Sequence, residues 1–285
     1  MRRTRAVNDQ KDRQEESGAC SWPSPPERLI LKSDEVHVFC TNLDLERPFI
    51  DSLERSLSAD ERERAGRFYF EKDRNHYVTA RALLRDILGR YLNLPPAQIR
   101  FCYGDHGKPA LAESFAKSRL RFNLSHAHGL ALYAVARGRE VGIDIELIRP
   151  DFADERIAEQ FFSHKEVTML RSLRDYMQQE AFFNCWTRKE AYVKARGEGL
   201  SLPLDQFSVS LTPGIPAALL SVEGDPEERS RWSLRELIPA PGYAAALAVE
   251  GKRCILNCWR WQSDGMDLRG DYSVTSRYFS SFSAL

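Results

Sequence analysis

The chain has 285 residues, enough for one large domain or two small ones, and its 42% hydrophobic and 29% charged content is ordinary for a folded globular protein. Its 41 Lys and Arg residues balance 41 Asp and Glu residues, and this zero net charge argues against a dedicated nucleic-acid-binding protein, which is usually strongly basic. The sequence shows no signal peptide, no apolar span of membrane length and no Cys-x-x-Cys pair among its six cysteines. We therefore expect a cytoplasmic protein that binds neither membranes nor nucleic acids.

The N-terminal part of the chain predicts a disordered segment, then a strand, then a helix. The first 28 residues are polar and contain few apolar side chains, so we expect them to be disordered. Alternation predicts a strand at Glu35–Cys40, and apolar spacing predicts a helix from Ser58 to Leu92, with Glu61 placed to form a capping box. Arg81 lies in an apolar stretch of this helix. It either binds a phosphate or carboxylate, or buries its stem and keeps its head in water.

A turn and two strands are predicted next. The turn is rich in Gly and Pro, spans residues 104–109 and contains Lys108, for which an exposed loop lysine is the simplest interpretation. The strands are Arg121–Ser125 and Leu130–Ala136. Ser125 and His126 are neighbours, but adjacent side chains of a strand point to opposite faces, and the sequence lacks the Gly-x-Ser-x-Gly motif of many hydrolases. Serine-hydrolase chemistry is therefore not expected.

The segment Val141–Leu147 alternates as a strand with Gly142, Asp144 and Glu146 on one face. The two carboxylates then lie about 7 Å apart along the strand. They either face water on a half-buried strand or bind a hard divalent cation such as Mg²⁺, which prefers oxygen ligands. In the second case Gly142 leaves room beside them for a ligand, and a third carboxylate would come from another segment.

The stretch that follows predicts two helices. Ser163 and Glu166 have the spacing of a capping box, which predicts a helix to about Tyr176. The second helix carries one i, i+4 row that runs from two aromatic side chains to two charged ones: Phe182, Trp186, Glu190 and Lys194. Charge on an otherwise apolar ridge is unfavourable unless something pairs with it. Glu190 and Lys194 therefore either pair with each other at the surface, or Glu190 supplies the third carboxylate.

The remainder of the chain predicts small strands and a tail. Apolar strands are expected at residues 207–211, 244–249 and 254–259, between turns that contain Pro and Gly. The Ser- and Gly-rich end from residue 263 is expected to be mobile. No short internal repeat is apparent.

Several of these stretches, in this order, resemble motifs of the phosphopantetheinyl transferases of the surfactin-synthetase-activating type. The motifs are Phe68-Tyr69, Ala80-Arg81-Ala82-Leu83-Leu84, Gly107-Lys108-Pro109, Phe122-Asn123-Leu124-Ser125-His126, Gly142-Ile143-Asp144-Ile145-Glu146, Phe161-Phe162-Ser163 with Glu166, Trp186-x-x-Lys189-Glu190-x-x-x-Lys194 and Gly199-Leu200-Ser201-Leu202-Pro203-Leu204. Each motif is short, but together they cover roughly residues 30 to 250.

The resemblance implies an α+β fold of two similar α/β halves related by a pseudo-twofold axis, each a helix packed on a small, mainly antiparallel sheet. The halves would span residues 29–138 and 139–262, after a disordered segment 1–28 and before a mobile tail 263–285. It also implies the reaction: transfer of 4′-phosphopantetheine from coenzyme A to a serine of an apo peptidyl or acyl carrier protein. The reaction would need Mg²⁺ and release adenosine 3′,5′-bisphosphate. A monomer is expected.

The resemblance further implies the residues of the metal and the chemistry. Asp144, Glu146 and Glu190 match the Mg²⁺ carboxylates of the family. Lys194 matches a catalytic-site lysine that contacts the pyrophosphate or the pantetheine. The general base would be Glu190, directly or through a metal-bound water, with Glu166 as the reserve.

A second set of residues matches the family's contacts to the nucleotide. Arg81 and Lys108 match contacts to the adenosine and its 3′-phosphate, and Ser125 and His126 match contacts around the same phosphate. Arg64 stands near a further basic position that precedes the Phe68-Tyr69 motif.

Two other functions fit some of these features. A Mg²⁺-dependent nuclease also uses clustered carboxylates with a nearby lysine, but the zero net charge and the lack of a basic stripe speak against it. A non-catalytic module that only binds carrier proteins would not need intact carboxylates, and all three are present.

Overall fold

The computed structural model describes residues 22–149, 153 and 155–261. The first elements are β1 (Glu35–Asn42), α2 (Arg47–Glu54), α3 (Ala59–Ala65), α4 (Glu71–Leu92), the 3-10 helix η1 (Pro96–Gln98), β2 (Phe101–Tyr103), β3 (Pro109–Leu111), η2 (Glu113–Ser118), β4 (Leu120–Ala127) and β5 (Leu130–Arg137). They are followed by β6 (Val141–Leu147), α5 (Glu155–Phe161), α6 (His164–Ser172), α7 (Asp175–Arg196), η3 (Gly199–Ser201), η4 (Leu204–Gln206), β7 (Phe207–Val209), β8 (Leu219–Val222), α8 (Glu228–Arg231), β9 (Trp232–Leu237), β10 (Tyr243–Glu250) and β11 (Ile255–Arg260).

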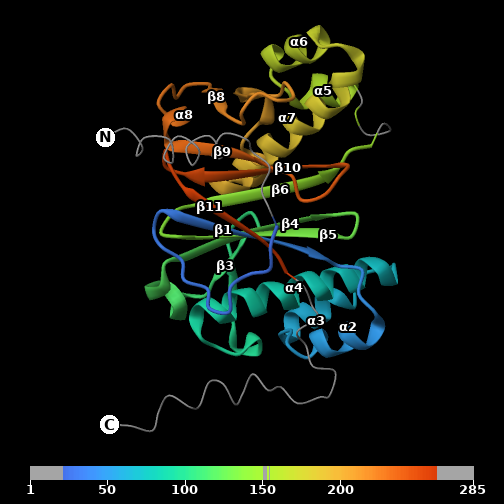
Figure 1. Cartoon of the computed structure of the whole chain (residues 1–285), viewed down its shortest axis with the longest axis vertical. Helices are drawn as coiled ribbons and strands as arrows, with labels where there is room; N and C mark the ends of the chain where they lie inside the picture. The colour runs from blue at the N-terminus through green and yellow to red at the C-terminus, as the bar shows by residue number, and fades with distance from the viewer. Residues whose placement is uncertain (1–21, 150–152, 154, 262–285) are drawn as a thin grey trace, which may run out of the picture.

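The described elements form four layers (Figure 1). The strands make one sheet in the order β11-β1-β5-β4 and a second in the order β6-β10-β9, while β2–β3 and β7–β8 are separate hairpins. Helices α2, α3 and α4 cover the outer face of the first sheet, and α7 covers the outer face of the second. The inner faces of the two sheets pack against each other.

This layering explains why the central strands are apolar on both faces. On β5, Tyr133 and Val135 pack toward α4, whereas Leu132 and Ala134 pack between the sheets. The cluster between the sheets also contains Ile143 of β6 and its counterparts on β10. Burial of this shared face joins the two halves of the molecule.

The two halves repeat the same order of elements. Apart from the 3-10 helices and the short α8, the first half has the order β1, α2, α3, α4, β2, β3, β4 and β5, and the second has the order β6, α5, α6, α7, β7, β8, β9 and β10. The sheet orders β1-β5-β4 and β6-β10-β9 correspond as well. The predicted α+β fold of two similar halves is therefore confirmed.

The last strand departs from this division. β11 runs parallel to β1 and pairs with it from Glu35–Ile255 to Cys40–Arg260. The expected second half, residues 139–262, thus contributes its final strand to the sheet of the first half.

The helix predicted from Ser58 to Leu92 is broken in two, which corrects that prediction. The Ser58–Glu61 capping box is present, but α3 ends at Ala65 and α4 begins at Glu71. In one continuous helix Glu61 and Arg81 would lie about 30 Å apart. They instead form a buried ion pair with 2.6 Å between Oε1 and Nη2, so this contact requires the chain to fold back.

The helix after Ser163 is also shorter than predicted. The capping box of Ser163 and Glu166 is present, and α6 ends at Ser172 instead of continuing to Tyr176, which lies in the first turn of α7.

An internal repeat, which the sequence alone did not reveal, connects the capping boxes to the long helices. Glu61 pairs with Arg85, and Glu166 pairs with Lys189, at N···O distances of 2.6 and 2.7 Å. Arg85 and Lys189 occupy the same position in two 22-residue helices, α4 and α7. All four side chains are buried.

Each buried cation also holds the loop after its helix. Arg85 donates to the carbonyls of Pro96 and Ile99, and Lys189 donates to those of Leu204 and Phe207. These carbonyls lie in the same places relative to two Leu-Pro-x-x-Gln segments, residues 94–98 and 202–206. The two halves therefore share this buried ion pair and its hydrogen bonds to the following loop, as well as a topology.

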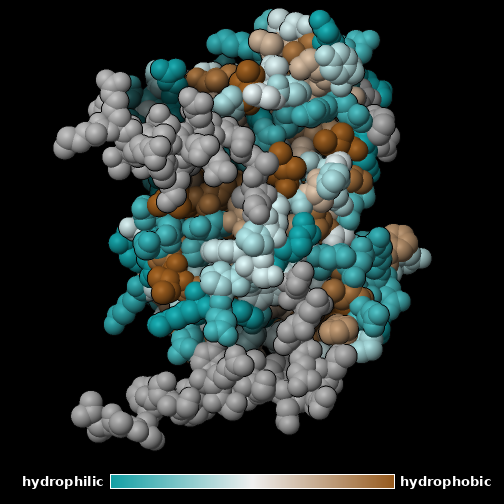
Figure 2. Space-filling model, viewed as in Figure 1, coloured by the Kyte–Doolittle hydropathy of each residue, from teal (hydrophilic) through white to brown (hydrophobic). Residues whose placement is uncertain are grey.

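The described helices were compared with the requirements of a membrane span. Within the described ranges, no helix combines the length and the apolarity that a membrane crossing needs. Figure 2 shows hydrophilic residues over much of one face, interrupted by smaller hydrophobic patches.

Candidate active site

Three side chains from both halves meet where β4, β6 and α7 come together. Ser125 of β4 donates its hydroxyl to Asp144 Oδ1 of β6, with 2.9 Å between the oxygens. Lys194 of α7 donates to the same Oδ1 at 2.6 Å and to Ser125 Oγ at 3.0 Å. Asp144 is only 3% exposed, and its other oxygen, Oδ2, is buried without a hydrogen-bond partner in the part of the chain that the structure describes.

The close approach of β6 and α7 places these groups together. A Cβ added to Gly142 would lie 2.1 Å from the carbonyl oxygen of Ala191 and 2.3 Å from the amide nitrogen of Ala195. The space beside Gly142 is therefore filled by the backbone of α7, which corrects the prediction that it is open to a ligand. Only glycine lets the strand and helix approach so closely.

The carboxylates around Asp144 repel one another. Burial raises the pKa of Glu146 to about 7, and the nearby charge of Asp144 adds to this effect. Burial and Asp144 also raise the pKa of Glu190, while the ammonium of Lys194 opposes the rise in both carboxyls. The cluster thus holds more negative charge than Lys194 balances.

These features fit a divalent cation. Within residues 22–149, 153 and 155–261, no group of three His, Cys, Asp or Glu side chains already has the geometry of a metal site. However, Asp144 Oδ2 is a buried oxygen without a donor among the described residues, and burial together with the charge of Asp144 raises the pKa of both Glu146 and Glu190 despite the nearby ammonium of Lys194. Hard oxygen ligands of this kind suit Mg²⁺.

A pocket of about 330 Å³ opens beside this cluster and has walls from both halves. Its lining residues are His106, Gly107, Lys108, Pro109, Asn123, Leu124, Glu190, Val193, Lys194, Gly197, Gly199, Leu202 and Leu204. It therefore brings the predicted Lys108, Glu190 and Lys194 to one cavity.

Lys108 is engaged with the protein at the edge of this pocket. Its ammonium lies 3.3 Å from Glu140 and donates to the carbonyls of Val141 and Ala195 at 3.4 and 3.1 Å. Burial lowers its pKa. Lys108 thus ties the loop of the first half to β6 and the end of α7.

Arg81 has one of the two surroundings that the sequence left open, because it binds a carboxylate. It is 6% exposed, so its head is not in water, and it pairs with Glu61. It also donates to the Tyr103 hydroxyl at 3.0 Å and lies 4.6 Å from the centre of the Phe101 ring. The carboxylate that it binds belongs to the protein, and a contact of Arg81 with a nucleotide stays a prediction.

Arg64 and His126 lie at the surface. The guanidinium of Arg64 lies 5.6 Å from the centre of the Tyr77 ring. His126 is exposed on β4, and desolvation together with the positive charges of His76 and Lys194 lowers its pKa. His126 therefore lies beside other basic groups, as a phosphate ligand would.

Glu166 is committed to structure, which corrects its expected role as a reserve base. Its Oε1 accepts from the Val209 amide at 2.7 Å, and its Oε2 accepts from the Ser163 amide and from Lys189, each at 2.7 Å. The side chain is 2% exposed. A general base needs a free oxygen within reach of the substrate proton.

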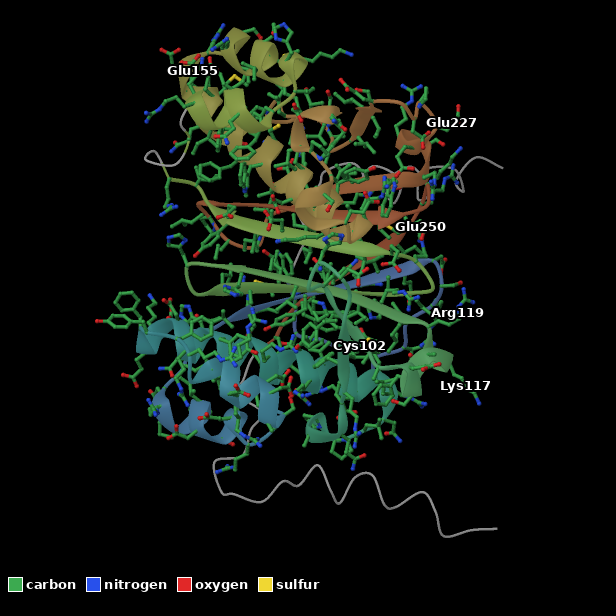
Figure 3. All side chains as sticks on the ribbon, turned by 180° about the vertical axis from the view of Figure 1, so that it is seen from behind. Cys102, Lys117, Arg119, Glu155, Glu227 and Glu250 are labelled. Carbon is green, nitrogen blue, oxygen red and sulfur yellow. The ribbon has the colours of Figure 1, made fainter. Side chains whose placement is uncertain are left out.

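Sequence analysis gave no role to Asn123 and did not predict the contacts of Glu250 beside the junction of the halves. Asn123 Oδ1 accepts the Ile143 amide at 2.9 Å and so joins β4 to β6; an Asn within an apolar strand is uncommon and was the available signal. At the junction, the Glu250 carboxylate accepts the Glu140 amide and the Glu250 carbonyl accepts from Arg139. Figure 3 shows Glu250 near the boundary between the two sheets.

Comparisons with known proteins agree with this arrangement. A model of the 4′-phosphopantetheinyl transferase superfamily matches residues 140–248, and a model of the 4′-phosphopantetheinyl transferase N-terminal region matches residues 47–137. The chain is 44% identical to the 4′-phosphopantetheinyl transferase HetI of Nostoc sp. PCC 7120 over 231 residues, which cover 81% of this chain and 94% of HetI. The chain belongs to the 4′-phosphopantetheinyl transferase superfamily.

This transferase is similar to other members as well. It is 32% identical to the 4′-phosphopantetheinyl transferase Sfp of Bacillus subtilis strain 168 over 193 residues, which cover 68% of this chain and 82% of Sfp. It is 30% identical to the human L-aminoadipate-semialdehyde dehydrogenase-phosphopantetheinyl transferase over 197 residues, or 64% of this chain and 63% of that protein. The predicted resemblance to the surfactin-synthetase-activating type is confirmed, and the nuclease and binding-module alternatives find no support.

Proposed function

We propose that this transferase uses coenzyme A and Mg²⁺ to load 4′-phosphopantetheine onto a serine of an apo peptidyl or acyl carrier protein. Membership of the superfamily supports transfer of phosphopantetheine to carrier proteins. The observation that supports the metal and the substrate is the Oδ2 atom of Asp144, which is buried with no hydrogen-bond partner in the described ranges and lies in a carboxylate cluster beside a pocket shared by both halves.

In this proposal Asp144, Glu146 and Glu190 hold the Mg²⁺, which when bound offsets the charge of the pyrophosphate. Lys194 binds the pyrophosphate oxygens next to it, because its side chain is 30% exposed and its ammonium already lies against Asp144. The residues of the pocket hold the rest of coenzyme A and fix the direction of attack.

The proposed reaction also transfers one proton, that of the carrier serine. The carrier serine oxygen forms a bond to the β-phosphorus of coenzyme A while the bond from that phosphorus to the bridging oxygen breaks. Adenosine 3′,5′-bisphosphate leaves with the electron pair. Glu190 takes the serine proton, since its carboxylate lines the pocket in which the carrier serine must meet coenzyme A.

The test is the intact mass of an apo carrier protein incubated with the transferase, coenzyme A and Mg²⁺. A peptidyl and a fatty-acid carrier are tested side by side, with a chelator control. We expect a gain of one phosphopantetheine that the chelator abolishes. No gain on either carrier would contradict the proposed reaction, and a gain that survives chelation would contradict the role of the metal.

A further inference from the structure

The hydrogen-bond pattern of Ser125 is fixed by the chemistry of its partners. Lys194 can only donate, so Ser125 Oγ accepts from it at 3.0 Å. Ionised Asp144 can only accept, so the single hydroxyl proton of Ser125 goes to Oδ1 at 2.9 Å. Ser125 is 9% exposed, and its hydroxyl has no second proton with which to bind a phosphate oxygen.

This pattern decides which oxygen of Asp144 is available. Ser125 and Lys194 both hold Oδ1, and Oδ2 is left buried with no partner in the described residues. A carboxylate held in this way cannot turn to exchange its oxygens without breaking two hydrogen bonds. Oδ2 is thus the oxygen presented to a cation.

The hydroxyl also comes from the other half of the molecule. Ser125 lies on β4, two residues after Asn123, so both side chains are on the same face of that strand. Asn123 accepts the amide of Ile143 on β6, directly next to Asp144. β4 therefore binds the backbone of β6 through Asn123 and the Asp144 carboxylate of β6 through Ser125.

We infer that Ser125 is a positioning residue that orients Asp144 toward the metal, and that it is not a ligand of the nucleotide 3′-phosphate. The inference rests on the proposed function, and it replaces the role that the family resemblance implied for Ser125. His126, the next residue, points to the opposite face of β4 and remains the candidate phosphate ligand.

Ser125→Ala tests this inference with two binding measurements. The first is the affinity for Mn²⁺, as a paramagnetic probe of the Mg²⁺ site, by electron paramagnetic resonance in the presence of saturating coenzyme A. The second is the ratio of affinities for adenosine 3′,5′-bisphosphate and adenosine 5′-monophosphate without metal, which isolates the contribution of the 3′-phosphate. We expect Mn²⁺ binding to weaken about 10- to 100-fold, as for other residues that orient a metal ligand, with an unchanged nucleotide ratio.

His126→Ala is the matched control and should give the opposite result, a lower nucleotide ratio with unchanged Mn²⁺ affinity. Ser125→Thr keeps the hydroxyl and should restore Mn²⁺ binding. If Ser125→Ala does not fold, Ser125→Cys, which has a similar size and only a weak donor, takes its place.

A fall in the nucleotide ratio for Ser125→Ala, with or without weaker Mn²⁺ binding, overturns the inference, and so does unchanged Mn²⁺ affinity. Failure of the proposed function would appear separately, in the wild type. A wild-type protein that binds no Mn²⁺ with coenzyme A would refute the metal site before any variant is compared, and the inference would fall with it.

Discussion

Folding disfavours the charged form of Glu190, yet the proposed reaction needs this carboxylate in the pocket. Burial and the neighbouring Asp144 raise its pKa above that of an ordinary glutamate, so the ionised form is less stable in the folded protein than in the unfolded chain. A side chain that lowers stability and lines a pocket is typical of a functional site.

Glu190→Gln should separate these two effects. The amide removes the repulsion, so we expect a melting temperature equal to or above that of the wild type. Carrier loading should slow by about 10²- to 10⁴-fold or more, because a general base and a metal ligand are both lost. Rates are measured by intact mass. Glu180→Gln, an exposed residue on the same helix, is the control and should load carriers normally; a normal rate for Glu190→Gln would refute the assignment.

His37 gives the protein a stability that depends on pH. Burial lowers its pKa from 6.5 to about 4, although Glu35 opposes this. Between these values the unfolded chain takes up a proton that the folded protein does not, so stability is full above pH 6.5 and falls as the pH drops toward 4. The loss should reach about 3 kcal/mol at the acid end.

Urea unfolding at pH 7 and pH 4.5 measures this loss. His37→Gln should lose less stability than the wild type over the same interval, because its side chain does not titrate. Equal losses in the two proteins would show that His37 does not titrate in this way.

At the scale of elements, a buried cation pairs each long helix with the capping-box glutamate of its own half. Lys189 on α7 is 0% exposed and pairs with Glu166, which is 2% exposed. Removing one partner of such a pair leaves a buried charge without compensation, whereas removing both does less harm.

Lys189→Met should therefore lower the free energy of unfolding by about 3–5 kcal/mol. The double variant Lys189→Met/Glu166→Gln should recover part of this loss. Chemical denaturation of the wild type, the two single variants and the double variant measures the coupling. Additive effects of the two single changes would mean that the pair does not act as a unit.

Elements whose signals are local were predictable, and contacts between distant segments were not. The capping boxes at Ser58 and Ser163 were identified because the residues involved lie three positions apart. The break between α3 and α4 was missed because the contact of Glu61 with Arg81, which requires it, is visible only in the fold. Gly142 was misassigned for the same reason, since the atoms that crowd it belong to a helix far along the chain.

The site shows the same division. Asp144 and Glu146 were placed together by strand alternation, and Glu190 and Lys194 by helical spacing, but the sequence could not show that Lys194 binds Asp144. The repeated Leu-Pro-x-x-Gln segments were present in the sequence, with three matching residues each. So short a match becomes meaningful only when both segments are seen to bind equivalent cations.

At the scale of the whole molecule, neither half is complete without the other. The inner faces of the two sheets share one apolar cluster, and β11 of the second half pairs with β1 of the first. Glu140 of the second half adds ion pairs across the same boundary, to Lys108 and Arg121 of the first. A monomer stays our prediction for the oligomeric state, which light scattering would check.

Separate expression of residues 1–138 and 139–285 tests this dependence. Each fragment would expose its inner sheet face, and the first would lack β11, so we expect neither to fold alone. Mixing the two should restore circular dichroism and carrier loading. A first fragment that is stable and monomeric by itself would show that β11 and the second sheet are dispensable for its fold.

The pairing of β11 with β1 also has a consequence for synthesis on the ribosome. β1 leaves the ribosome early, whereas the strand that covers its outer edge is among the last described segments to be translated. Until then that edge presents unpaired amide and carbonyl groups, which are a template for incorrect pairing with other nascent chains. Contacts between such distant segments also close slowly. The first sheet is therefore begun with β1 and completed only after the whole second sheet has been translated.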